Sequence, residues 1–144
     1  MLAYLDTSAL AKWYLNEPRS EDFSAWVCHQ QNTHISSLTA LEFRCLVARR
    51  KRRGDISSEL EQRLFAVFRA DVQVGHLIQH PVENRDVVDA VVLLEHVFPT
   101  ALRTLDAIHL RIAVRIGAAA LATADNIMAA AANALGMQVF NFAN

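Results

Sequence analysis

Acidic residues recur in this sequence at boundaries between expected strands and expected helices. The four that do so are Asp6, Glu42, Asp106 and Asp125. Each has an ordinary structural explanation, since Asp6 and Asp125 stand where a helix needs an N-cap residue. Glu42 follows Thr39 at the spacing of a capping box, and Asp106 falls in a first helical turn, where the helix dipole favours an anion. One acid alone therefore gives no reason to expect chemistry.

Taken together, the four acids form a set of hard oxygen ligands. The carboxyl ends of parallel strands share one edge of a sheet, where open α/β folds bind their ligands. Crowded carboxylates raise one another's pKa values unless a cation lies among them. Mg²⁺ or Mn²⁺ suits such a group, and none of the six histidines shows a zinc-like spacing. The pattern favours a divalent-metal site for phosphodiester hydrolysis.

The elements that must position these acids alternate between strand and helix. Short apolar strands are expected at 2–5, 33–36, 72–78, 119–123 and 137–142. Helices are expected at 8–15, 38–53, from Ser58 onward with Ser58 and Glu61 as a capping box, 84–97, 104–116 and 125–135. Because the strands are apolar on both faces, the alternation predicts an α/β fold with a parallel sheet covered by helices.

The bulk composition predicts one domain without a membrane span. A chain of 144 residues that is 53% apolar can bury one substantial core. Cys28 and Cys45 match neither a zinc site nor a disulfide scaffold, which suits a reducing cytosol. The beginning of the chain, with Asp6 and no basic leader, does not read as a signal peptide. No apolar run approaches the roughly 20 residues that cross a bilayer.

Basic residues gather in one segment although the net charge is only −1. Six of the 14 Lys and Arg residues fall in this basic cluster, which comprises Arg44, Arg49, Arg50, Lys51, Arg52 and Arg53. They can contact RNA phosphates, or they can form a solvated helix end that complements the helix dipole. We favour the contacts with RNA.

Several other residues have a chemical and a structural interpretation. Trp13, Tyr14 and Trp26 can stack on bases, but core or interface positions are favoured. His109 lies one turn after Asp106 and is expected to be a packed histidine rather than a general acid. Asp86 is expected to face solvent.

The segments that carry the acids resemble those of the PIN-domain nucleases. LDTSAL, SSLTALEF, TLDAIHL and LATAD follow in the family's order and span nearly the whole chain. The resemblance is greatest to the VapC-type toxins of bacterial and archaeal toxin–antitoxin pairs. It implies a single PIN-like nuclease domain over residues 1–144, with a three-layer fold and a parallel sheet of about five strands flanked by helices.

The resemblance also implies a site and an activity. The catalytic and metal-binding acids would be Asp6, Glu42, Asp106 and Asp125, with Asp6 and Asp106 as the principal ligands. Thr7, Ser8 and Thr123 would be supporting polar groups, or simply turn and cap hydroxyls. The implied activity is Mg²⁺- or Mn²⁺-dependent endonucleolytic cleavage of RNA in the cytoplasm. The implied partners are a cognate antitoxin, which can also use the basic cluster, and a second copy in a homodimer.

Two other functions are compatible with parts of the pattern. A catalytically silent PIN-like module would bind RNA or a protein, but it would be expected to lack some of the acids. A phosphatase or receiver-type domain would use Asp6 to form an aspartyl phosphate. Such sites need a lysine near the phosphoryl group, and Lys12 and Lys51 are misplaced for it. Metal-dependent RNA cleavage is the favoured function.

Overall fold

The computed structural model describes residues 1–144 as strands and helices in alternation. The strands are β1 (Ala3–Leu5), β2 (Thr33–Ser36), β3 (Leu77–His80), β4 (Ala120–Thr123) and β5 (Gln138–Asn141). The helices are α1 (Thr7–Tyr14), α2 (Ser20–Val27), α3 (Ser37–Arg52), α4 (Ser58–Gln73), α5 (Asn84–His96), α6 (Thr104–Arg115) and α7 (Asn126–Ala134). No helix is long and apolar enough to cross a membrane.

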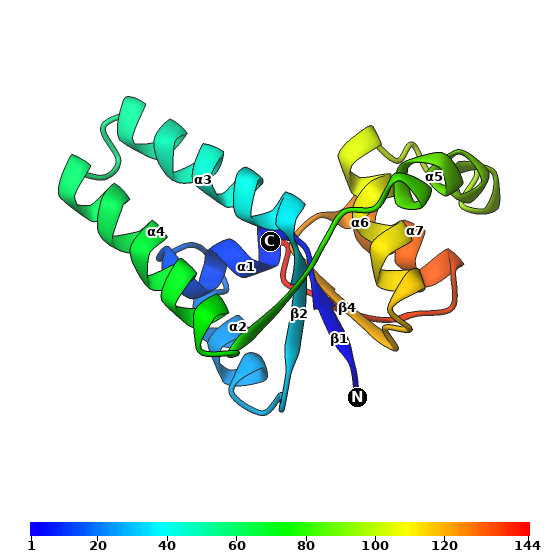
Figure 1. Cartoon of the computed structure of the whole chain (residues 1–144), viewed down its shortest axis with the longest axis horizontal. Coiled ribbons are helices and arrows are strands. Elements are labelled where there is room, and N and C mark those ends of the chain that lie inside the picture. The colour runs from blue at the N-terminus through cyan, green and yellow to red at the C-terminus, as the bar shows by residue number, and fades with distance from the viewer.

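The strands form one five-stranded sheet in the order β3-β2-β1-β4-β5, and every pairing in it is parallel. Helices cover both faces, with α1 to α4 on one side and α5 to α7 on the other (Figure 1). The predicted α/β class and three-layer PIN-like arrangement are thus confirmed. The strand order reverses between β1 and β4, and the crevice at such a point is where open α/β sheets bind ligands.

Each face of the sheet has its own apolar core, because side chains alternate along a strand. Tyr4 and Leu121 point into the core formed with α5, α6 and α7. Their neighbours Leu5 and Ala122, together with Ile35, point into the core formed with α1 to α4. Burial on both faces explains why the central strands β1 and β4 are largely apolar.

Two predicted helix starts are wrong by a small shift. Helix α3 begins at Ser37, and the hydroxyl of Thr39 accepts from the Ser36 amide at 3.2 Å. Glu42 therefore lies beyond the first turn and is not part of a capping box. Helix α4 has Ser57 as its N-cap residue, which accepts from the Leu60 amide at 3.1 Å, so Ser58 is already helical.

The strand predicted at 72–78 is partly wrong. Helix α4 continues to Gln73, and Gly75 follows with φ of 86°, a left-handed conformation that glycine adopts without strain. Strand β3 begins only at Leu77. Val72 and Val74 suggested a strand, but the amphipathic pattern of α4, which buries Phe68, extends the helix through Val72 to Gln73.

Asp86 corrects another expectation, because it is fully buried rather than solvent-facing. Arg115 of α6 donates to its two carboxylate oxygens at 2.7 and 3.0 Å. The partner lies on another helix, 29 positions away, and periodicity within α5 does not reveal it. Of the aromatic residues, Tyr14 and Trp26 pack against the core beneath α1 to α4, whereas Trp13 is exposed.

Candidate functional site

The four acids predicted from the sequence line one hollow at the carboxyl edge of the sheet. Asp6 follows β1, Asp125 follows β4, Glu42 lies on α3 and Asp106 lies in the first turn of α6. All four line a hollow of about 530 Å³, called here the acidic hollow. Strands β1 and β4 are neighbours, so the hollow opens at the point where the strand order reverses.

Asp6 is the most firmly held of the acids and is almost completely buried. Its Oδ1 accepts from the Ala9 amide at 3.0 Å and from the Ser8 hydroxyl at 2.7 Å, and its Oδ2 accepts from the Thr123 hydroxyl at 2.6 Å. It is therefore the N-cap of α1 as well as a wall of the hollow. Burial raises the pKa of Asp6, although the hydrogen bonds from Thr123, Ala9 and Ser8 oppose this.

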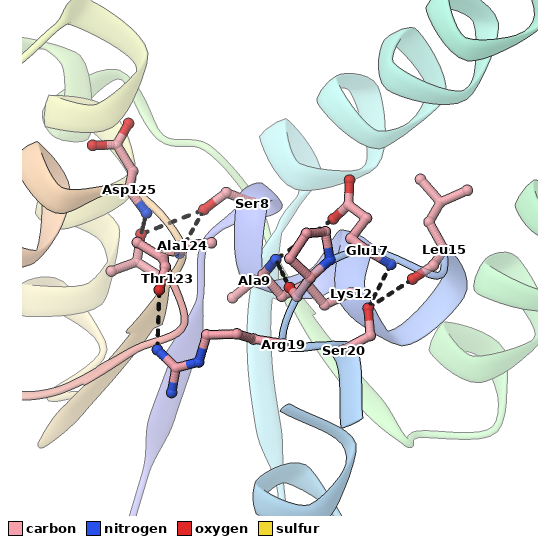
Figure 2. A network of polar contacts seen from close by, with 12 residues as sticks. Ser8, Ala9, Lys12, Leu15, Glu17, Arg19, Ser20, Thr123, Ala124 and Asp125 are labelled. Atoms are coloured by element: carbon pink, nitrogen blue, oxygen red, sulfur yellow. Dashed lines mark hydrogen bonds and ion pairs between the residues drawn. The ribbon is translucent and has the colours of Figure 1, made fainter. Parts of the chain in front are cut away.

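The segment after β4 is tied to helix α1. Ser8 accepts from the Ala124 amide at 2.9 Å, and Thr123 accepts from the Asp125 amide at 3.0 Å. Figure 2 shows Ser8 facing this segment across the gap between the two elements. The supporting groups predicted from the sequence thus contact the site. Thr123 and Ser8 bind the carboxylate of Asp6, and the Thr7 hydroxyl donates to Glu42 at 2.8 Å.

Glu42 ends a buried chain of polar groups. Tyr4 and His109 Nδ1 lie 2.7 Å apart, and His109 Nε2 contacts the Glu42 carboxylate. If the Tyr4 hydroxyl donates, a neutral His109 carries its proton on Nε2 and donates it to Glu42. Burial raises the pKa of Glu42, but the hydrogen bonds from His109 and Thr7, together with the charge interactions with His109 and Arg103, outweigh it, so this pKa lies below its ordinary value. As predicted, His109 is packed, and only 1% of it is exposed.

Asp106 and Asp125 are bridged by Arg103. The guanidinium donates from Nε to Asp106 at 3.3 Å and from Nη2 to Asp125 at 3.0 Å. Burial raises the pKa of Asp106, and the neighbouring charge of Asp125 adds to this while Arg103 opposes it. Sequence reasoning missed Arg103. Its spacing of three residues from Asp106 is compatible with a local ion pair, but nothing in the sequence indicates its contact with Asp125.

Carboxylate oxygens are the donors that Mg²⁺ and Mn²⁺ prefer, so the residues of the acidic hollow fit such an ion. In the present conformation no three acidic, histidine or cysteine side chains are grouped closely enough to hold a metal ion. Arg103 instead occupies the space between two of the carboxylates. An ion that used the two oxygens now bound to Arg103 would have to displace that side chain.

The basic cluster divides into two groups. Arg44 pairs with Glu61 at 3.2 Å, and Arg50 pairs with Glu17 at 2.5 Å. These two arginines already have partners in the fold. The other members, Arg49, Lys51, Arg52 and Arg53, are exposed, and of the whole cluster only Arg49 lines the acidic hollow.

Comparison with known proteins identifies the family. Residues 3–134 match the PIN domain family. No curated protein matches the sequence. Three solved structures show the same fold. A sarcin-ricin loop cleaving toxin of Mycobacterium tuberculosis, VapC20, shares 16% identity at a TM-score of 0.70, over 90% of this chain and 94% of that one. FitAcB from Neisseria gonorrhoeae shares 16% at a TM-score of 0.70, over 97% of each chain.

The third structure is VapBC2 from Rickettsia felis, bound to a DNA fragment from its promoter. It shares 14% identity with this chain at a TM-score of 0.68, over 99% of each chain. Identities this low show likeness of fold alone. The family match, by contrast, covers nearly the whole sequence, including all four acids of the hollow. The chain belongs to the PIN domain family.

Proposed function

We propose that this protein is a metal-dependent endoribonuclease that acts as the toxin of a toxin–antitoxin pair. The observation that carries the proposal is the convergence of four acids on one hollow at the carboxyl edge of a PIN-domain sheet. Two solved structures of similar fold, a toxin that cleaves the sarcin-ricin loop and VapBC2, support the proposal of a toxin that acts on RNA.

The proposed metal ligands are Asp6 and Asp106, completed by Glu42 and Asp125. The ion would be Mg²⁺ or Mn²⁺. When bound, it supplies a nucleophilic water at neutral pH and charge stabilisation for in-line displacement at a phosphodiester. The raised pKa values of Asp6 and Asp106 reflect the cost of keeping these carboxylates ionised without a cation, and a bound divalent ion removes that cost.

The chain's own residues would supply orientation. Ser8, Thr123 and the Ala9 amide fix both oxygens of Asp6, so its free lone pairs have defined directions. Thr7 and His109 fix Glu42 in the same way. Outer groups of this kind hold metal ligands in place and typically change metal affinity or activity 10-fold to about 100-fold when removed. Thr7, Ser8 and Thr123 are accordingly positioning residues rather than ligands.

RNA would approach over the four exposed residues of the basic cluster. Arg49 lines the acidic hollow, while Lys51, Arg52 and Arg53 stand exposed at the end of α3. Arg44 and Arg50 contribute less, because each is already paired with a glutamate. Neutralising phosphates in this way makes binding strongly dependent on salt. The cytoplasm is the proposed site of this activity.

The proposed partners are an antitoxin and a second copy of the chain. The antitoxin is supported by the FitAcB and VapBC2 structures, which have the same fold. For the homodimer, the exposed face of α5 offers an apolar surface. Val87, Val91 and Leu94 lie on it at helical spacing, and Phe98, in the turn just after α5, is 82% exposed. A contiguous apolar face of this kind marks an interaction surface.

Cleavage of RNA by the purified protein tests this function. We expect a mixed-sequence RNA to be cut internally in Mn²⁺ or Mg²⁺ and to stay intact in chelator. Asp6→Asn and Asp106→Asn should each lower the rate at least about 100-fold, because they remove direct ligands. Asp89→Asn is the matched control, since Asp89 is an exposed acid outside the hollow. Tight RNA binding without cleavage by the wild type would instead indicate a catalytically silent binding module.

A further inference from the structure

The acidic hollow contains a cation of its own. Arg103 directly precedes α6 and donates to one oxygen each of Asp106 and Asp125, at 3.3 and 3.0 Å. Its side chain is 71% exposed, so packing does not fix it in this place. The attraction of the carboxylates does so, and it also raises the pKa of Arg103, chiefly through Asp106. Arg103 is thus an exposed, permanently charged counter-ion of these two carboxylates.

We propose, resting on the proposed function, that Arg103 is an exchangeable contact. It covers Asp106 and Asp125 in the free protein, leaves them when they bind a divalent ion, and then contacts a phosphate of the RNA. The same side chain would therefore oppose metal binding and favour substrate binding.

The exchange follows from which oxygens are in use. Oδ1 of Asp125 caps α7 by accepting from the Ile127 and Met128 amides at 2.8 and 3.2 Å. Only Oδ2 remains for a ligand, and Arg103 occupies it. Oδ2 of Asp106 is occupied in the same way. A divalent ion bound to these two oxygens would lie close to the guanidinium of Arg103, and the two cations would repel each other. They therefore compete for the two oxygens.

The charge and the exposed position of Arg103 determine which group it would contact after it leaves the carboxylates. Once a divalent ion has neutralised Asp106 and Asp125, Arg103 no longer has an anionic partner there. The next anion to reach the hollow is a phosphate of the RNA, which the bound ion attracts. A guanidinium presents a planar fork of donors that matches phosphate oxygens, and its charge persists at every working pH. The exposed position of Arg103 on the lining of the hollow leaves it free to turn toward RNA.

The test uses Arg103→Gln in the full chain and measures two affinities. Without RNA, calorimetric titration with Mn²⁺ should give binding at least about threefold tighter than in the wild type, because a competing cation is gone. With Mn²⁺ present, anisotropy of a phosphorothioate-linked RNA oligonucleotide should show weaker binding. The slope of log affinity against log salt should fall by about 0.7, the value for one phosphate contact to a single strand.

Arg85→Gln is the matched control. Arg85 is also an exposed arginine paired with a neighbouring acid, Glu83, but it lies outside the hollow. It should change neither affinity. If the wild type binds Mn²⁺ and Arg103→Gln binds it no more tightly, or if RNA affinity is unchanged, the exchange is overturned. If neither protein binds Mn²⁺, the proposed metal site itself fails, and the exchange fails with it. Circular dichroism and melting temperature show whether each variant is folded.

Discussion

Thr123→Val removes the hydroxyl that holds the buried carboxylate of Asp6. The Thr123 hydroxyl donates to Asp6 at 2.6 Å and accepts from the Asp125 amide at 3.0 Å, and its side chain is fully buried. Valine keeps the shape and removes both bonds. A hydrogen bond to an ionised group contributes about 2 kcal/mol, and an unpartnered amide costs about 1 kcal/mol. We expect the free energy of unfolding to fall by about 3 kcal/mol at neutral pH.

Urea unfolding in chelator, followed by circular dichroism, measures this loss. Thr33→Val is the matched control, because Thr33 is also a buried strand residue but donates only to the neutral carbonyl of His76 at 3.3 Å. It should lose no more than about 1 kcal/mol. At acid pH the penalty of Thr123→Val should shrink, because Asp6 is then protonated and a neutral acceptor gains less from the bond. A loss at neutral pH no larger than that of Thr33→Val would refute the role given to Thr123.

Three further predictions concern stability and assembly. Asp86→Asn should lower the free energy of unfolding by about 3 kcal/mol, because Arg115 loses its buried carboxylate; a loss below about 1 kcal/mol in urea titration would contradict this. Asp6 and Asp106 have pKa values raised by burial, so in chelator the folded state holds protons that the unfolded state has released. Stability should therefore fall as the pH rises from about 4 through these raised pKa values, and Asp6→Asn should flatten that fall in pH-dependent melting. Val91→Glu on the exposed face of α5 should convert a dimer into a folded monomer in light scattering, and a dimer that persists would remove this face from the interface.

The architecture was predictable because local patterns determine it. Strands such as Ala120–Thr123 are apolar on both faces, which indicates a covered parallel sheet, and the topology then brings their carboxyl ends to one edge. That reasoning placed Asp6 and Asp125 side by side although the sequence separates them by more than 100 residues. The errors lie where tertiary packing outweighs local preference, as at residues 72 and 73, where helix α4 continues to Gln73 in place of the predicted strand.

The contacts that tune the site were beyond sequence reasoning. Arg103 looks like an ordinary residue before a helix, and only the fold brings it to Asp125. The Tyr4–His109–Glu42 chain likewise joins β1, α6 and α3, which no spacing within one element reveals. Asp86 and Arg115 meet across two packed helices for the same reason. Carboxylates at strand ends can be recognised by position, whereas the groups that orient or neutralise them depend on three-dimensional proximity.

The most direct test of the proposed metal site is an anomalous difference map from crystals soaked in Mn²⁺. We expect a peak in the acidic hollow at direct coordination distance, about 2.1 Å, from carboxylate oxygens of both Asp6 and Asp106. The peak should vanish in Asp106→Asn crystals soaked in the same way. A hollow without a peak at saturating Mn²⁺, or an ion bound only away from these two acids, would contradict the assignment of a divalent-metal nuclease site.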